Sequence, residues 1–179
     1  MTIDHKALMQ SVLIQYVNAK KWQGAPFGHI KSLSNSHVGN VGQDFIELLC
    51  KTIGFDCVFP ATSRGTRSTQ HPWDMRIEYA TFEVKTATED ISGNFQFNHV
   101  RYHREYEALL CLGIAPSNLY FGAWLKDDVV TGRAGRLVTM DKGSSATFKL
   151  TKSKAQIHPI ADFDSQIIEL LALLENRRQ

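Results

Sequence analysis

The stretch HPWDMRIEYATFEVKTATED, residues 71–90, decides the fold because it contains two adjoining strand patterns. Apolar and polar side chains alternate through residues 73–79 and again through residues 80–87, which is the spacing of half-buried β-strands. The two patterns follow each other directly, so a turn at residues 78–79 would join them as a β-hairpin. Because Glu-Tyr is not a favoured two-residue turn, a longer loop or a shifted register stays open.

Three charged residues fall on one face of this predicted hairpin. With the turn at 78–79, Asp74 lies opposite Glu83, and Lys85 follows two residues later on the same face. Opposed Cβ atoms are about 4.5–5.5 Å apart, and two carboxylates at that range repel unless a cation lies between them. Mg²⁺ is bound in this way by one or two carboxylates together with substrate phosphates. A solvated sheet face with a cross-strand ion pair is the alternative interpretation. The opposite face, towards the core, carries Met75, Ile77, Phe82 and Val84.

The order of these residues resembles the signature of the PD-(D/E)XK nuclease superfamily. That signature is a Pro-Asp on one strand and an acid-X-Lys on the next. Here Pro72 and Asp74 are followed by Glu83-Val84-Lys85, with Trp73 between the proline and the aspartate. The departure costs little, because the proline has no chemical role.

The flanking sequence extends the resemblance over about residues 40–125. A helix pattern that carries Glu47 precedes the hairpin, and FQFNHVRYHREYEALLCLGIAP, residues 95–116, follows it. This second block is similar to the segment after the acid-X-Lys strand in many type II restriction endonucleases. The resemblance therefore implies an enzyme that cuts DNA at a short specific site.

The resemblance also implies roles for individual residues. Asp74 and Glu83 would be metal ligands, and the backbone carbonyl of Val84 would be a third ligand. Lys85 would orient or polarise the attacking water. Glu47 would reach the metal site from the helix, although it also suits an ordinary solvated helix position. The implied cofactor is Mg²⁺, for which Mn²⁺ would substitute, and no nucleotide cofactor is expected.

The rest of the chain predicts an α/β fold with a central mixed β-sheet flanked by helices. With the resemblance, this becomes a restriction-endonuclease-like core of the order αβββαβ, at about residues 40–125 of a single nuclease domain 1–179. Residues 98–107 are predicted as helical or mixed. Helices are predicted at 4–21 and 41–53. Residues 126–177 are predicted as a basic C-terminal segment followed by a last helix. Strands are predicted at 57–59, 108–113 and 119–125, with shorter ones near 136–140 and 147–150.

The bulk composition fits a soluble globular protein but does not by itself select a ligand. Apolar residues make up 43% of the chain, and the net charge is only +2. The three cysteines lie in apolar runs, which predicts reduced core residues rather than a zinc site or disulfides. Neither a signal-peptide pattern nor a membrane-length apolar run is present, so we expect a cytoplasmic protein without a membrane partner.

Basic residues nevertheless cluster locally, which suits double-stranded DNA as the partner. They occur in the 61–72 loop, in the block 98–104 and along the C-terminal segment. Asn98 and Arg101 are also candidates for base edges, because Asn pairs well with adenine and Arg with guanine. The candidate DNA contacts are Arg64, Arg67, Asn98, Arg101, Arg104, Arg133 and Arg136.

One active site per chain implies a homodimer, since two sites are needed to cut both strands of a palindrome. Three alternatives remain open from the sequence. A DNA repair or transposon-end nuclease would act without a short cognate site. A catalytically inactive DNA-binding module would bind without cutting. An unrelated domain with an ion-paired sheet face would do neither.

Overall fold

The computed structural model describes Lys6, Met9, Val12 and residues 21–68, 71–143 and 145–178. The predicted helix 4–21 thus lies largely outside the described residues. The helices are η2 (Gly28–Ser32), α2 (Asn35–Ile53), α3 (Lys126–Val130), η3 (Lys154–Gln156), η4 (Ile160–Asp162) and α4 (Phe163–Arg178). The strands are β1 (Cys57–Val58), β2 (Met75–Ile77), β3 (Ala80–Thr88), β4 (Asn94–Val100), β5 (Ala108–Ile114), β6 (Leu119–Leu125), β7 (Leu137–Thr139), β8 (Phe148–Ser153) and β9 (His158–Pro159).

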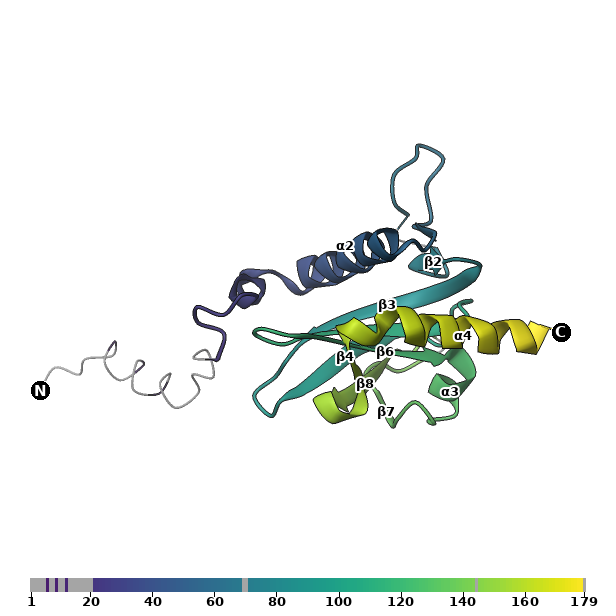
Figure 1. The fold of residues 1–179 in the computed structure, drawn as a ribbon. Coiled ribbons are helices and arrows are strands. Elements are labelled where there is room, and N and C mark those ends of the chain that lie inside the picture. The colour runs from purple at the N-terminus through teal and green to yellow at the C-terminus, as the bar shows by residue number, and fades with distance from the viewer. Residues whose placement is uncertain are drawn as a thin grey trace, which may run out of the picture.

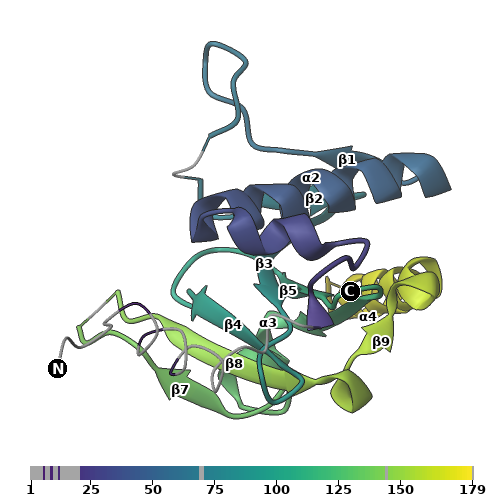
Figure 2. The ribbon, with the colours of Figure 1, turned by 90° about the vertical axis from the view of Figure 1, so that its left-hand side faces the viewer.

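Three layers form the fold, with the larger sheet in the middle (Figure 1; Figure 2). This sheet has the order β1-β2-β3-β5-β6-β9, and the smaller sheet has the order β4-β8-β7. β3 and β5 run parallel and the other neighbours in the larger sheet are antiparallel, which confirms the predicted mixed sheet. The helices α2 and α4 cover one face of it, and the smaller sheet covers the other.

The strand β5 is buried along its whole length because both faces of the larger sheet are covered. Leu110 and Leu112 belong to the core beneath the helices, whereas Leu109 and Cys111 belong to the core beneath the smaller sheet. All three cysteines are buried free thiols, as predicted. None of the described helices has the length and apolar character needed to cross a membrane.

The hairpin has the predicted register, with Met75 opposite Phe82 and Ile77 opposite Ala80. Its turn begins at Glu78, which has a φ of +53°. That conformation is unusual for a non-glycine residue, but two hydrogen bonds to Asp56 hold the turn in place. The Glu78 N–H donates to the Asp56 carbonyl, and Glu78 Oε1 accepts from the Asp56 N–H, both at 2.8 Å.

The connection between β3 and β5 differs from the prediction. Residues 98–107 are not helical: β4 runs to Val100, and turns and irregular chain fill residues 101–107. Phe95 and Phe97 are buried whereas Gln96 is exposed, so the alternation has the period of a strand and not of a helix. The crossover helix of the predicted αβββαβ order is therefore replaced by strand β4, which pairs with β8 in the smaller sheet.

The helix α2 begins six residues before the predicted start because Ser34 caps it, accepting a hydrogen bond from the His37 N–H. It ends at Gly54, which has the left-handed conformation expected of a C-terminal glycine. On its buried face Ile46 and Cys50 are fully covered, whereas Leu48 is exposed.

Candidate active site

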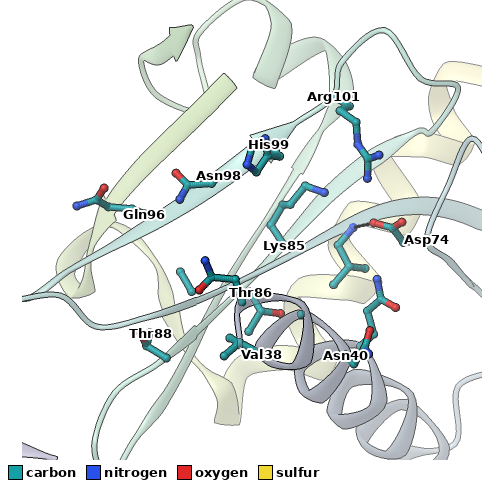
Figure 3. Close-up of a pocket in the computed structure, with 15 residues that line it drawn as sticks. Val38, Asn40, Asp74, Lys85, Thr86, Thr88, Gln96, Asn98, His99 and Arg101 are labelled. Carbon is teal, nitrogen blue, oxygen red and sulfur yellow. Dashed lines mark hydrogen bonds between the residues drawn. The ribbon is translucent and has the colours of Figure 1, made fainter. Parts of the chain in front are cut away.

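A cleft of about 440 Å³ opens along β3, just beyond the end of β2. On β3, β2 pairs only with Ala80–Phe82, and no described strand pairs with that edge of β3 beyond Phe82. Residues of α2 line one side of the cleft and residues of β4 line the other, with β3 between them (Figure 3). An unpaired strand edge has backbone donors and acceptors available to a ligand.

The helix wall of the cleft lies close to β3 because Gly42 has no side chain. A Cβ atom at Gly42 would lie 1.8 Å from Thr86 Oγ1. Any larger residue would push α2 away from the sheet. Gly42 therefore sets the distance between the helix wall and the floor of the cleft.

Glu83 is buried beneath the cleft and pairs with two cations through one oxygen. Its Oε1 lies 2.5 Å from Lys85 Nζ and 3.3 Å from Arg101 Nε. The exposed side-chain fractions are 0% for Glu83, 12% for Lys85 and 29% for Arg101, so the two cations are the more accessible members of the cluster. The second oxygen, Glu83 Oε2, is buried and has no hydrogen-bond partner among the described residues. A buried carboxylate oxygen without a partner is costly and is a natural ligand for a cation.

Asp74 reaches the cleft by a geometry different from the predicted one. β2 begins at Met75, so Asp74 does not form the predicted strand pair with Glu83. Its backbone N–H donates to the Phe82 carbonyl at 2.8 Å, and its Oδ2 accepts from the Val84 N–H at 2.9 Å (Figure 3). The N–H and C=O of one strand residue point to the same side. The Val84 carbonyl therefore also points to the side of β3 where Asp74 lies.

Tyr106 closes this cluster on the core side. Burial raises the pKa of its phenol, and the charges of Glu83 and Asp74 raise it further. The hydroxyl is buried and has no hydrogen-bond partner among the described residues. Both carboxylates thus act on the same buried phenol, which stays neutral at physiological pH.

A β-bulge in β4 decides which of its side chains face the cleft. The pairing with β8 is regular up to Phe97 and shifts by one residue before Val100, and His99 between them has a φ of +57°. One extra residue reverses the alternation of side chains. Asn98 and His99 therefore both line the cleft, and Val100 is buried. Arg101 faces the cleft as a result, where it meets Glu83.

The structure does not bring Glu47 to the cleft. Its carboxylate pairs with Lys51 on the same helix, with 2.7 Å between Oε1 and Nζ. The residue of α2 that lines the cleft one turn earlier is Gln43, together with Asn40. Because α2 packs on β3 through Gly42, its polar side chains at the cleft are amides rather than the predicted acid.

The predicted DNA contacts divide into three groups. Asn98 and Arg101 line the cleft, and Arg64 and Arg136 are exposed. The other three make contacts within the protein. Arg67 pairs with Asp44 at 2.8 Å and stacks on Phe59, Arg104 donates to the His71 carbonyl, and Arg133 pairs with Asp128.

The donor set fits a hard divalent cation bound by few protein ligands. No group of three or more His, Cys, Asp or Glu side chains able to hold a metal occurs in the part of the chain that the structure describes. Two carboxylates and one backbone carbonyl are, however, a sufficient protein contribution for Mg²⁺, which keeps several water ligands. The unpartnered Glu83 Oε2 is the observation that supports this fit.

Comparison with known proteins gives a similarity at the level of structure. No protein-family model matches the chain, and no curated protein sequence matches it. A solved structure of a bacterial homing endonuclease is similar, with a TM-score of 0.43 and 12% sequence identity over 67% of this chain and 75% of that chain. A similarity of this size does not assign the chain to a family.

Gln96 and Gln43 line the cleft and were not among the residues predicted from the sequence. Gln96 lies between Phe95 and Phe97, and this alternation was sufficient to predict a strand with Gln96 on its exposed face. Gln43 follows Gly42, a small residue at a helix–sheet contact, but nothing in the sequence reveals which face of α2 that contact selects.

Proposed function

We propose that this protein is a metal-dependent endonuclease that hydrolyses phosphodiester bonds of double-stranded DNA. The observation that carries this proposal is the convergence of Asp74, Glu83, Lys85 and Arg101 at one cleft, with one buried carboxylate oxygen left unpaired. A purely structural ion pair would need neither the cleft nor the unpaired oxygen. The finer proposal is a type II restriction enzyme of the PD-(D/E)XK kind, which cuts at a short specific site.

The metal would be Mg²⁺, with Mn²⁺ as a substitute, held by Asp74, Glu83 and the Val84 carbonyl. When bound, it would polarise the scissile phosphate and lower the pKa of a bound water. The other charges come from the chain itself. Arg101 would contact a non-bridging phosphate oxygen, since its guanidinium is 29% exposed at the cleft.

Lys85 is the residue best placed to act on the attacking water. Its side chain lies in the cleft between β3 and Arg101 (Figure 3), and its ammonium pairs with Glu83. Its compact donor would orient the water against phosphorus. The attacking water gives up a proton to solvent, the new P–O bond forms as the bond to the 3′-oxygen breaks, and the 3′-oxygen takes up a proton from solvent. The products are a 5′-phosphate and a 3′-hydroxyl.

A homodimer is part of the proposal. Each chain has one cleft of this kind among its described residues, and cutting both strands of a duplex at a palindrome needs two such clefts related by two-fold symmetry.

The experiment that tests the proposal is incubation with unmethylated phage DNA and Mg²⁺. Discrete fragments are the expected result. A smear or nicked circles would indicate a repair or structure-specific nuclease instead. Lys85→Ala should abolish cutting, whereas Lys51→Ala, which removes an exposed lysine of α2 outside the cleft, should not. Intact DNA at every Mg²⁺ and Mn²⁺ concentration would overturn the proposed activity.

A further inference from the structure

The outer face of the β4–β8 ribbon continues the cleft along β4 with uncharged polar side chains. Its inner face is buried and mostly apolar, with Phe95, Phe97 and Leu150 in the core and Lys152 opposite Phe95. On the outer face, Gln96 and Asn98 are exposed and line the same cleft as Lys85. A ligand that enters the cleft would therefore meet these two amides.

The spacing of the two amides matches the repeat of a duplex. Gln96 and Asn98 are two residues apart along β4, which corresponds to about 6.6–6.8 Å in a strand. Successive base pairs rise by about 3.4 Å, so this separation spans two base-pair steps. A two-stranded β-ribbon also fits the major groove, which is about 12 Å wide. The smaller sheet is only two strands wide where Gln96 lies opposite Thr151, because β7 pairs with β8 only at Phe148–Leu150. This end of the sheet thus has the width and the spacing to lie along that groove.

The two amides have the groups needed to bind adenine. The side-chain amide of Asn98 makes no hydrogen bond with any described residue, so its oxygen and its nitrogen are both available. Gln96 donates from Nε2 to Asp90 Oδ2 at 2.9 Å, which fixes the plane of the amide while Oε1 stays without a described partner. An amide pairs with adenine through its oxygen at N6 and through its nitrogen at N7.

Asp90 is itself held rigidly. Its Oδ1 accepts from the backbone N–H groups of Ser92 and Asn94, both at 2.9 Å. These bonds make Asp90 a fixed support for Gln96, and not a ligand of the nucleic acid. The methyl group of Thr151, which is exposed and lies opposite Gln96 on β8, suits contact with the thymine methyl of the same base pair.

We propose that Gln96 and Asn98 read adenines two base pairs apart in the major groove, next to the phosphate that is cut. This inference rests on the proposed nuclease function and names the bases that the site selects. Asp90 is a positioning residue for Gln96, and Thr151 completes the first of the two contacts.

Selection of bound duplexes from a randomised pool by the full-length protein in Ca²⁺ tests the inference. The duplexes that the parent protein selects should be enriched in adenine at two positions with one base pair between them. Asn98→Ala should lose the preference at one position and Gln96→Ala at the other, each with about a 10- to 100-fold loss of affinity for the selected site. Asp90→Ala should weaken only the preference assigned to Gln96. Asn176→Ala, an exposed amide on α4, is the matched control and should change neither.

Substitution of 7-deazaadenine in the selected site separates base reading from phosphate contact. Removing N7 at the Asn98 position should weaken binding of the parent and leave Asn98→Ala unaffected. If the Gln96 and Asn98 variants lost the same affinity for every sequence, the amides would contact phosphates, and this would overturn the inference. Unchanged preferences in both variants would overturn it as well. Neither result would touch the nuclease proposal, which fails separately if the parent cuts no DNA in Mg²⁺.

Discussion

Arg101 Nε lies 3.3 Å from Glu83 Oε1, although Glu83 belongs to the larger sheet and Arg101 directly follows β4 of the smaller one. The contact depends on the bulge at His99, which reverses the alternation of β4 just before Arg101. With regular pairing, Arg101 would point into the core and Val100 would point to the cleft. A distortion of one residue in a strand thus completes the charge cluster of the candidate site.

Replacing His99 tests the role of the bulge. His99→Gly should keep the fold and the cleavage activity, because glycine adopts a positive φ without strain. His99→Val should lower the free energy of unfolding by about 1–3 kcal/mol, because a β-branched residue is strained there, and should slow cleavage by displacing Arg101. Thermal unfolding and cleavage rates check both variants. His103→Val is the control, since His103 is exposed and has an ordinary φ. Equal stability of His99→Val and the parent would show that the bulge is not strained.

Glu83→Gln should destabilise the metal-free protein. If Glu83 and Asp74 only repelled each other, removing one carboxylate would instead stabilise the metal-free protein. In the structure Glu83 is fully buried and balances Lys85 and Arg101, and its loss leaves both cations without a partner. Breaking a buried pair costs about 3–5 kcal/mol, and the partial exposure of the two cations places the expected loss at the lower end, about 3 kcal/mol. Urea unfolding without metal measures it. A variant as stable as the parent would mean that the carboxylates do repel each other in the metal-free state.

Lys85→Arg separates charge from geometry. If Lys85 positions water as a compact donor, the larger planar guanidinium should not replace it. We expect most cleavage to be lost in Lys85→Arg, and at least as much in Lys85→Ala, while metal-dependent DNA binding is retained. Single-turnover rates on a saturating duplex give the comparison. A near-normal rate for Lys85→Arg would reduce the residue to an electrostatic role.

The salt dependence of DNA binding should distinguish Arg101 from Arg67. Each phosphate contact contributes about 0.9 to the slope of log affinity against log salt concentration. Arg101→Ala should lower that slope by about 1. Arg67→Ala should lower it less, because its guanidinium is held by Asp44 and Phe59. An equal decrease of the salt-dependence slope in the two variants would contradict the prediction.

The Asp90 carboxylate should make stability depend on pH. Burial opposes its ionisation, but the hydrogen bonds from Gln96, Asn94 and Ser92 outweigh this effect and lower its pKa below the ordinary value of 3.8. A lowered carboxyl pKa stabilises the fold above the unfolded-state pKa, and this contribution disappears as the pH falls through the folded-state pKa. The stability advantage of the parent over Asp90→Asn should therefore be constant near pH 6 and shrink below about pH 3.8. Chemical unfolding at a series of pH values measures it, and a constant difference down to pH 2 would contradict it.

The hairpin and its register could be predicted because they depend on local alternation. The Met75–Phe82 pair follows from a turn at 78–79 and the period of two along each strand. The contacts of Asp74 could not be predicted in the same way. The Val84 N–H donates to the Asp74 side chain instead of to the backbone carbonyl of a neighbouring strand. This contact depends on where β2 stops pairing with β3.

The walls of the cleft depend on contacts between distant segments. Gln43 lines it, and Glu47 does not, because Gly42 packs on Thr86, a contact between residues far apart in the sequence. The bulge at His99 is also set by tertiary structure, since the His99 imidazole forms a hydrogen bond with Thr147, the residue before β8. Sequence patterns can identify the chemical groups of such a site, but its geometry is fixed by packing.

The cleavage rate of Asp74→Asn in Mg²⁺ tests the central claim most directly. Asparagine keeps the size of the side chain and an oxygen that can accept from the Val84 N–H, so the fold should persist while the negative charge is lost. We predict that the parent cuts a bound duplex in a single turnover. Asp74→Asn should bind the same duplex equally well in Ca²⁺ but should not cut it above background in Mg²⁺. Cleavage by Asp74→Asn at the parent rate would contradict a metal-dependent nuclease site in this cleft.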